Sequence, residues 1–123
     1  MAIETLLVVS DDKQVYSLIK KLFEKDGIFN VIHTANSEEE ADKVLKQETI
    51  TVVISDYDLK QKSTGNRLVE RWRKEYPSIR AAFILTGGAP TGIAETEGVD
   101  AVIQKTSRDW RDRIKRILLS ING

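Results

Sequence analysis

The sequence predicts an α/β protein: a three-layer sandwich in which a five-stranded parallel sheet is covered by helices on both faces. Two observations lead to this class. Short apolar runs alternate with amphipathic segments along the whole chain, which is typical of βαβ units with right-handed crossovers. Three of the five runs are continuously apolar, as expected for parallel strands buried on both faces. The 123 residues suffice for one domain with a sizeable core.

The strands are predicted from short runs of apolar, mostly β-branched or aromatic residues. They are centred, in chain order, on Leu6–Val9, Val31, Val52–Ile54, Ala81–Leu85 and Ala101–Ile103.

Apolar residues at helical spacing predict the helices between these strands. The four clear stripes are Val15, Leu18, Ile19, Leu22 and Phe23; Ala41, Val44 and Leu45; Leu68, Val69, Trp72 and Tyr76; and Trp110, Ile114, Ile117, Leu118 and Ile121. The first stripe ends before Gly27, and the third is stopped by Pro77. The second begins at a capping box formed by Ser37 and Glu40. The segment Gly87–Gly98 carries four glycines and a proline, so we expect the fourth helix to be short or irregular.

Composition excludes several classes of function. The 19 basic and 19 acidic residues cancel, so no global field favours direct binding to nucleic acid or to an anionic membrane. The chain has no cysteine, which rules out disulfides, zinc–thiolate sites and thiol catalysis. It shows neither the positively charged start of a signal peptide nor an apolar run long enough for membrane insertion. We therefore expect a cytoplasmic protein.

Residues whose side chains can react or bind a ligand follow four of the predicted strands. Asp11 and Asp12 come after the first strand, Asp56 after the third, Thr86 after the fourth and Lys105 after the fifth. In open α/β sheets, ligands bind outside the carboxyl ends of the strands, where the strand order reverses. We therefore expect these five side chains to meet at one edge of the sheet.

Three carboxylates at one edge need a partner. Two of them about 4 Å apart repel each other by roughly 4 kcal/mol at an effective dielectric constant of about 20, so one binds a proton or a divalent cation neutralises the group. An oxygen-only set of ligands suits Mg²⁺. Lys105 supplies a positive charge for an anion, and Thr86 supplies a hydroxyl donor. These are the parts of a phosphoryl-transfer site in which a carboxylate acts as nucleophile.

Each of these residues also has a simpler interpretation. Asp11 or Asp12 can cap the first helix, because aspartate accepts hydrogen bonds from the free N–H groups at a helix start. Asp56 can be a turn residue, and Lys105 a solvated lysine at a strand end. Their joint placement favours the functional interpretation.

These residues lie in four blocks, "VVSDD", "VVISDYDL", "FILTG" and "VIQK", at four successive strand ends. With them the chain resembles a response-regulator receiver domain over essentially its whole length. The resemblance implies the sheet order 2-1-3-4-5 and phosphorylation of Asp56 by the phosphohistidine of a sensor histidine kinase or a histidine phosphotransfer protein. It also implies Mg²⁺ held by Asp11, Asp12, Asp56 and the backbone carbonyl of Asp58. Thr86 is then the switch hydroxyl, and Lys105 contacts the phosphoryl group.

By this resemblance, residues 1–123 form a single receiver domain without an output domain. Such a domain is a signalling switch that catalyses only its own phosphorylation and dephosphorylation, and its downstream protein partner stays open. The aromatic residue that receivers usually carry three positions before the lysine is replaced by Val102. Two alternatives remain: a receiver-like docking module that is not phosphorylated, and a phosphatase of the haloacid-dehalogenase type, since "DYD" (Asp56 to Asp58) is similar to that family's paired aspartates.

Overall fold

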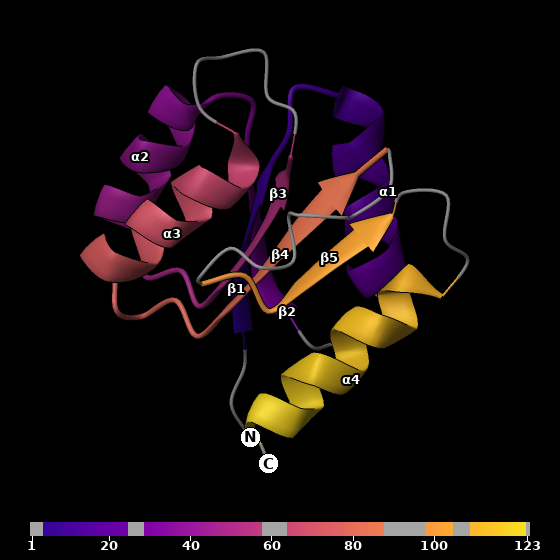
Figure 1. Ribbon diagram of the computed structural model, residues 1–123. Helices are drawn as coiled ribbons and strands as arrows, with labels where there is room; N and C mark the ends of the chain where they lie inside the picture. The colour runs from indigo at the N-terminus through magenta and orange to yellow at the C-terminus, as the bar shows by residue number, and fades with distance from the viewer. Residues whose placement is uncertain (1–3, 25–28, 58–63, 88–97, 105–108, 123) are drawn as a thin grey trace.

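A computed structural model describes residues 4–24, 29–57, 64–87, 98–104 and 109–122. Its elements, in chain order, are β1 (Glu4–Val9), α1 (Lys13–Glu24), β2 (Phe29–Ala35), α2 (Glu38–Gln47), β3 (Val52–Asp56), α3 (Gly65–Glu75), β4 (Ala81–Thr86), β5 (Ala101–Gln104) and α4 (Trp110–Asn122). All neighbouring strands are parallel, in the order β2-β1-β3-β4-β5 (Figure 1). The predicted fold class and the strand order implied by the resemblance are confirmed.

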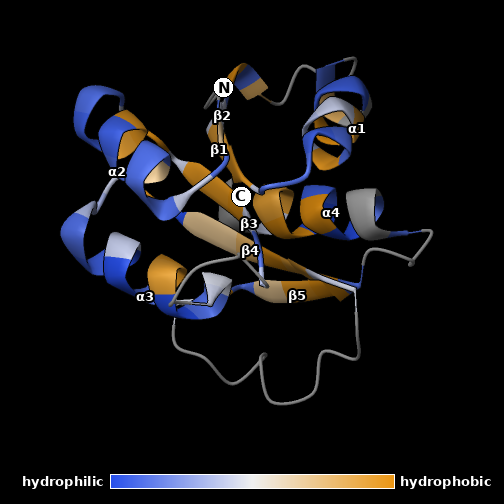
Figure 2. Ribbon diagram, turned by 90° about the horizontal axis from the view of Figure 1, so that it is seen from above, coloured by the Kyte–Doolittle hydropathy of each residue, from blue (hydrophilic) through white to orange (hydrophobic). Residues whose placement is uncertain are grey.

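The sheet is the middle of three layers. Helices α2 and α3 cover one face, and α1 and α4 cover the other (Figures 1 and 2). Successive residues of a strand point to opposite faces. Accordingly, Leu7 and Val9 of β1 belong to the core beneath α2 and α3, whereas Leu6 and Val8 belong to the core beneath α1 and α4. Both faces of β1 are therefore buried, which explains its continuous apolar run.

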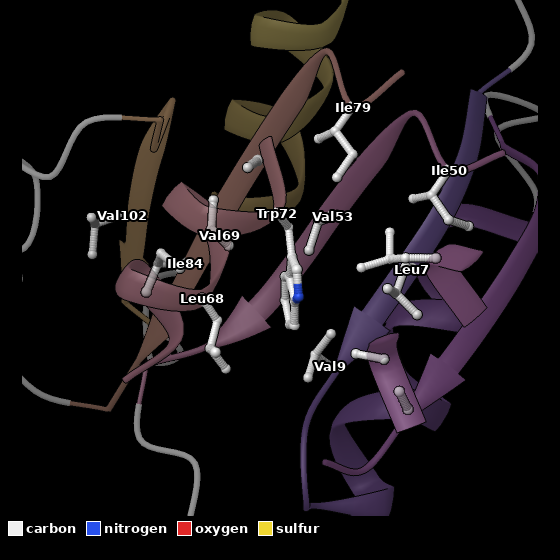
Figure 3. Close-up of a cluster of buried hydrophobic side chains, with 14 residues drawn as sticks. Leu7, Val9, Ile50, Val53, Leu68, Val69, Trp72, Ile79, Ile84 and Val102 are labelled. Carbon is white, nitrogen blue, oxygen red and sulfur yellow. The ribbon is translucent and has the colours of Figure 1, made fainter. Parts of the chain in front are cut away.

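Among the described residues, Trp72 of α3 is the largest fully buried side chain, and it lies at the centre of the core beneath α2 and α3 (Figure 3). Its indole Nε1 donates a hydrogen bond to Asp42 Oδ1 of α2 at 2.9 Å. This satisfies the polar atom of an otherwise apolar ring. The second core contains an edge-to-face pair, Phe23 of α1 and Phe29 of β2, with ring centroids 5.1 Å apart.

The four predicted helices are present in the structure, with two local differences in how their side chains are placed. Leu18 was expected on the buried stripe of α1 but is 49% exposed, because Ile19 and Phe23 already fill the position against the sheet. The N-cap of α2 is Ser37, whose Oγ accepts from the N–H of Glu40 at 3.2 Å. The Glu40 carboxylate accepts from the N–H of Asn36 at 2.7 Å, one residue before the N-cap.

Helix α3 ends at Glu75, two residues before Pro77, as expected. The prediction of a short or irregular helix between β4 and β5 concerns residues 88–97, which lie outside the described residues. In the described ranges, no helix combines the length and the apolar character that crossing a membrane requires.

Candidate functional site

Asp56 is the last residue of β3, at the edge marked by the strand arrowheads in Figure 1. Its side chain is only 3% exposed. In the register of the sheet, Asp56 pairs with Leu85 of β4, so Thr86 lies one residue further along the neighbouring strand. Thr86 is also buried, with 7% of its surface exposed. A carboxylate and a hydroxyl therefore lie at the carboxyl ends of two adjacent strands, as the sequence predicts.

The closest described partner of the Asp56 carboxylate is Ser10, which the sequence analysis did not single out. Ser10 follows β1, and Val9 pairs with Ser55, which places Ser10 beside Asp56. The Ser10 hydroxyl donates to Asp56 Oδ2 at 2.5 Å. The sequence "VVSDD" contained the signal that could have identified Ser10. Ser10 comes directly after the strand and before both acids, and this position faces the end of the neighbouring strand.

Asp11 and Asp12 lie just beyond Ser10, and both are exposed. Oδ1 of Asp12 accepts from the N–H of Gln14 at 2.9 Å, and its backbone carbonyl accepts from the N–H of Val15. These are the contacts of an N-cap residue at the start of α1. The simpler interpretation, in which one of the two acids caps the first helix, is thus correct for Asp12 in this structure.

Tyr16 of α1 fixes the backbone behind Ser10. Its hydroxyl is hydrogen-bonded to the carbonyl oxygens of Ser10 and Ala35, at the ends of β1 and β2. Burial raises the pKa of Tyr16 to about 12, and the charges of Glu40, Asp56 and Asp11 contribute in the same direction. Tyr16 therefore stays protonated at neutral pH and acts as a hydrogen-bond donor.

Gly65, the first residue of α3, lies against the backbone of Asp56. A Cβ at this position would stand 2.0 Å from the carbonyl oxygen of Asp56, far inside contact distance. The N–H of Gly65 donates to the carbonyl of Tyr57, and the N–H of Tyr57 donates to the carbonyl of Leu85, both at 2.8 Å. Only glycine allows this approach, so the start of α3 and the end of β3 are held together directly behind Asp56.

The oxygen atoms at this edge show whether the site suits a Mg²⁺ ion. Asp11, Asp12 and Asp56 supply carboxylate oxygens, the ligand type that Mg²⁺ prefers. Two of the three already have other partners: Ser10 bonds Asp56, and the Gln14 N–H bonds Asp12. Considering only the residues described, no group of three or more Asp, Glu, His or Cys side chains is arranged to hold a metal ion. The donor chemistry fits Mg²⁺.

Two predicted site residues, Asp58 and Lys105, lie outside the described residues. Their placement at this edge therefore stays a prediction. Gln104, the residue before Lys105, pairs with Thr86 in the register of β4 and β5.

Comparison with solved structures finds receiver domains that align over nearly the whole chain. A response regulator receiver domain protein from Clostridium thermocellum is 29% identical, with a TM-score of 0.79 and coverage of 98% of this chain and 95% of the other. A response regulator from Thermotoga maritima is 27% identical, with a TM-score of 0.80 and coverage of 99% and 100%. A CheY-like receiver domain protein from Methanospirillum hungatei shares the fold at 22% identity, with a TM-score of 0.79 and coverage of 98% and 95%.

A comparison with curated proteins finds no match. The family model described as "response regulator receiver domain" matches residues 6–115. This span includes most of β1, all of β2 to β5, the buried Asp56 and Thr86, and the acids that follow β1. The chain therefore belongs to the response regulator receiver domain family of two-component signalling.

Proposed function

We propose that this receiver domain accepts a phosphoryl group on Asp56 and changes conformation in response. The observation that carries the proposal is the buried Asp56 carboxylate at the carboxyl end of β3, beside Thr86 on the next strand. A carboxylate at the carboxyl end of a parallel strand lies where open α/β sheets bind their ligands. Membership of the receiver family supports the same role for Asp56.

In the proposed reaction, a carboxylate oxygen of Asp56 attacks the phosphorus of a phosphohistidine. A P–O bond forms, the P–N bond breaks, and the imidazole leaves with its bonding electron pair. The Thr86 hydroxyl donates a hydrogen bond to a phosphoryl oxygen, and Lys105 neutralises part of the negative charge. Asp11, Asp12, Asp56 and the carbonyl of Asp58 would hold Mg²⁺, which, when bound, offsets the charge on the phosphoryl oxygens.

The proposed donor is a sensor histidine kinase or a histidine phosphotransfer protein in the cytoplasm. The downstream partner of this receiver domain is proposed to be a protein. In this role the chain catalyses only its own phosphorylation and its own hydrolytic dephosphorylation.

The test is chemical labelling with acetyl phosphate and Mg²⁺, followed by intact-mass spectrometry. We expect one phosphoryl group on the wild-type chain and none on Asp56→Asn. Glu48→Gln is the matched control, because it neutralises an exposed acid at the C-terminal end of α2, the end of that helix opposite to this edge. Equal labelling of wild type and Asp56→Asn would overturn the assignment.

A docking module that is not phosphorylated is the second candidate. It is favoured by one observation: within the described ranges, the acids of the site are not grouped to hold a metal ion. A chain that stays unlabelled by acetyl phosphate at saturating Mg²⁺ would support this candidate. The phosphatase alternative has no support, because the chain belongs to the receiver family and its "DYD" sequence begins at the end of β3.

A further inference from the structure

Ser10 lies at the carboxyl end of β1, beside Asp56. It is 0% exposed, and each of its polar groups has a partner. Its N–H donates to the Ala35 carbonyl at 3.0 Å, and its own carbonyl is hydrogen-bonded to the Tyr16 hydroxyl. Its Oγ accepts from the N–H of Asp12 at 3.1 Å and donates to Asp56 Oδ2 at 2.5 Å. Since one lone pair of Oγ is directed at Asp12, the hydroxyl hydrogen is directed at Asp56.

This hydrogen bond is incompatible with a cation on the same side of Oδ2. The hydroxyl hydrogen of Ser10 lies between Oγ and Oδ2 and uses the lone pair of Oδ2 on this side. A cation that approaches Oδ2 from this side therefore requires the hydroxyl to turn away. Hydrogen bonds to a carboxylate are stronger than those between neutral groups, so this rotation opposes binding.

We propose that Ser10 is a positioning residue that holds the Asp56 carboxylate in the cation-free receiver and competes with Mg²⁺ for Oδ2. The inference deepens the proposed function and rests on it, because it takes Asp56 as a ligand of the ion. Ser10 thereby sets the Mg²⁺ concentration above which the carboxylate is released for metal binding. No contact of Ser10 with the phosphoryl donor is required.

The test measures Mg²⁺ affinity in the unphosphorylated full chain by calorimetric titration. We expect Ser10→Ala to bind Mg²⁺ about tenfold more tightly than wild type, since the variant no longer has a charge-assisted hydrogen bond to break. Ser55→Ala is the matched control. Ser55 is equally buried, at 0% exposure, but its hydroxyl donates to the backbone carbonyl of Asp56 at 3.0 Å. We expect the affinity of Ser55→Ala to equal that of wild type.

A second variant keeps the test valid if Ser10→Ala does not fold. Ser10→Cys preserves the shape but offers a weaker donor, and no other cysteine is present to form a disulfide. We expect its affinity to lie between those of wild type and Ser10→Ala. The inference is wrong if Ser10→Ala binds Mg²⁺ equally or more weakly, if Ser55→Ala shifts by the same amount, or if no variant binds Mg²⁺.

These outcomes are distinct from failure of the proposed function. A chain that binds Mg²⁺ with the expected order of affinities but is not labelled at Asp56 by acetyl phosphate would refute phosphorylation and leave the role of Ser10 intact. A chain that is labelled at Asp56 but shows no gain in affinity in Ser10→Ala would refute the role of Ser10 alone.

Discussion

Gly65 is the residue at which a single methyl group most directly disturbs the site. In Gly65→Ala, the new Cβ would stand 2.0 Å from the Asp56 carbonyl oxygen, so α3 or β3 must shift. We expect unfolding in urea to show a loss of about 1–3 kcal/mol, the usual cost of overpacking, together with slower labelling of Asp56. Gly87→Ala is the control for stability, because among the residues that the structure describes a Cβ there would meet nothing within 4 Å. If the two variants are equally stable, the structure adjusts to the new Cβ of Gly65→Ala without a loss of stability.

Tyr16 provides a prediction on pH. Its pKa is raised to about 12, first by burial, so the native state keeps the phenol proton at a pH where the unfolded chain, with the ordinary value of 10.0, has lost it. The native state then binds more protons than the unfolded state, and stability falls as pH rises from about 10 to 12. We expect Tyr16→Phe to be less stable than wild type at neutral pH, because the carbonyls of Ser10 and Ala35 lose the hydrogen bond from the Tyr16 hydroxyl.

The measurement for Tyr16 is denaturant unfolding at several pH values, with absorbance titration of the phenols. The gap in stability between wild type and Tyr16→Phe should narrow above pH 10. The Tyr16→Phe variant has one phenol fewer than wild type. If the missing phenol is one with a pKa of about 10 rather than about 12, the assignment of the raised pKa to Tyr16 is wrong.

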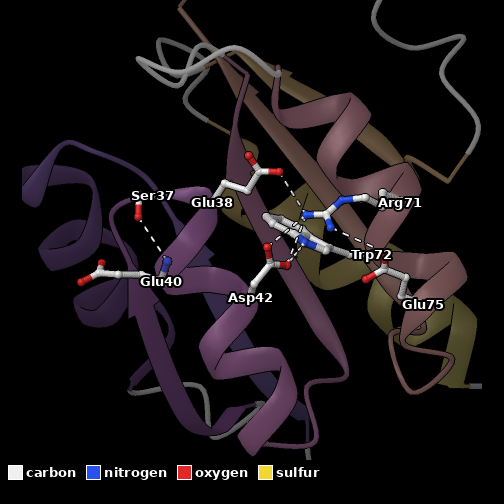
Figure 4. A network of polar contacts seen from close by, with 7 residues as sticks. All are labelled: Ser37, Glu38, Glu40, Asp42, Arg71, Trp72 and Glu75. Atoms are coloured by element: carbon white, nitrogen blue, oxygen red, sulfur yellow. Dashed lines mark hydrogen bonds and ion pairs between the residues drawn. The ribbon is translucent and has the colours of Figure 1, made fainter.

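At the scale of elements, α2 and α3 are joined by a polar network on their outer side (Figure 4). Arg71 of α3 contacts Glu38 and Asp42 of α2, at 3.1 and 3.2 Å, and Glu75 of its own helix at 3.5 Å. Burial works against the charged form of Arg71, but the hydrogen bond to Asp42 and the surrounding carboxylates outweigh it and raise its pKa. The same carboxylate of Asp42 accepts from the buried Trp72 Nε1.

Asp42 is therefore the member of the network whose loss costs most. We expect Asp42→Ala to lose about 1–3 kcal/mol of stability in urea, because the buried indole N–H is left without an acceptor. Asp42→Asn keeps an acceptor oxygen for the indole and should lose less. Glu75→Gln, on an exposed ion pair, should change stability by less than about 1 kcal/mol. If Asp42→Asn and Asp42→Ala are equally destabilised, the charge rather than the indole bond is what matters.

At the scale of the whole molecule, the prediction concerns how a structural change at Thr86 is transmitted to the neighbouring strand β5. Val102 pairs with Ile84 of β4 and is 6% exposed, within the core beneath α2 and α3. Its β-branched side chain is short and restricted at χ1, so it cannot sweep the volume of an aromatic ring. We expect beryllofluoride, a phosphoryl mimic, to leave the methyl NMR signals of Val102 nearly unchanged, while amides of segment 87–98 shift or change their exchange rates.

Large shifts at Val102 with a quiet 87–98 segment would mean that the ordinary coupling of receivers operates here. Asp56→Asn treated with beryllofluoride is the control, since it removes the carboxylate on which the mimic assembles.

The sequence by itself determined the α/β class, the position of every described strand and helix, and the placement of Asp56 and Thr86 at strand ends. These follow from apolar periodicity and from the way parallel strands end at one edge, which are local properties of the chain. The order β2-β1-β3-β4-β5 came from the resemblance, and the sheet register confirms it.

Only the tertiary structure decided which side chain faces Asp56. The motif drew attention to Asp11 and Asp12, but both are exposed and Asp12 caps α1, while Ser10 contacts the carboxylate. The exposure of Leu18 on α1 was likewise a property of packing against the sheet. The physical reason is the same in both cases. Periodicity indicates which residues share an apolar stripe, whereas the contacts that a residue makes depend on how separate elements pack together. Ser10 and Asp56, for example, are 46 residues apart in sequence.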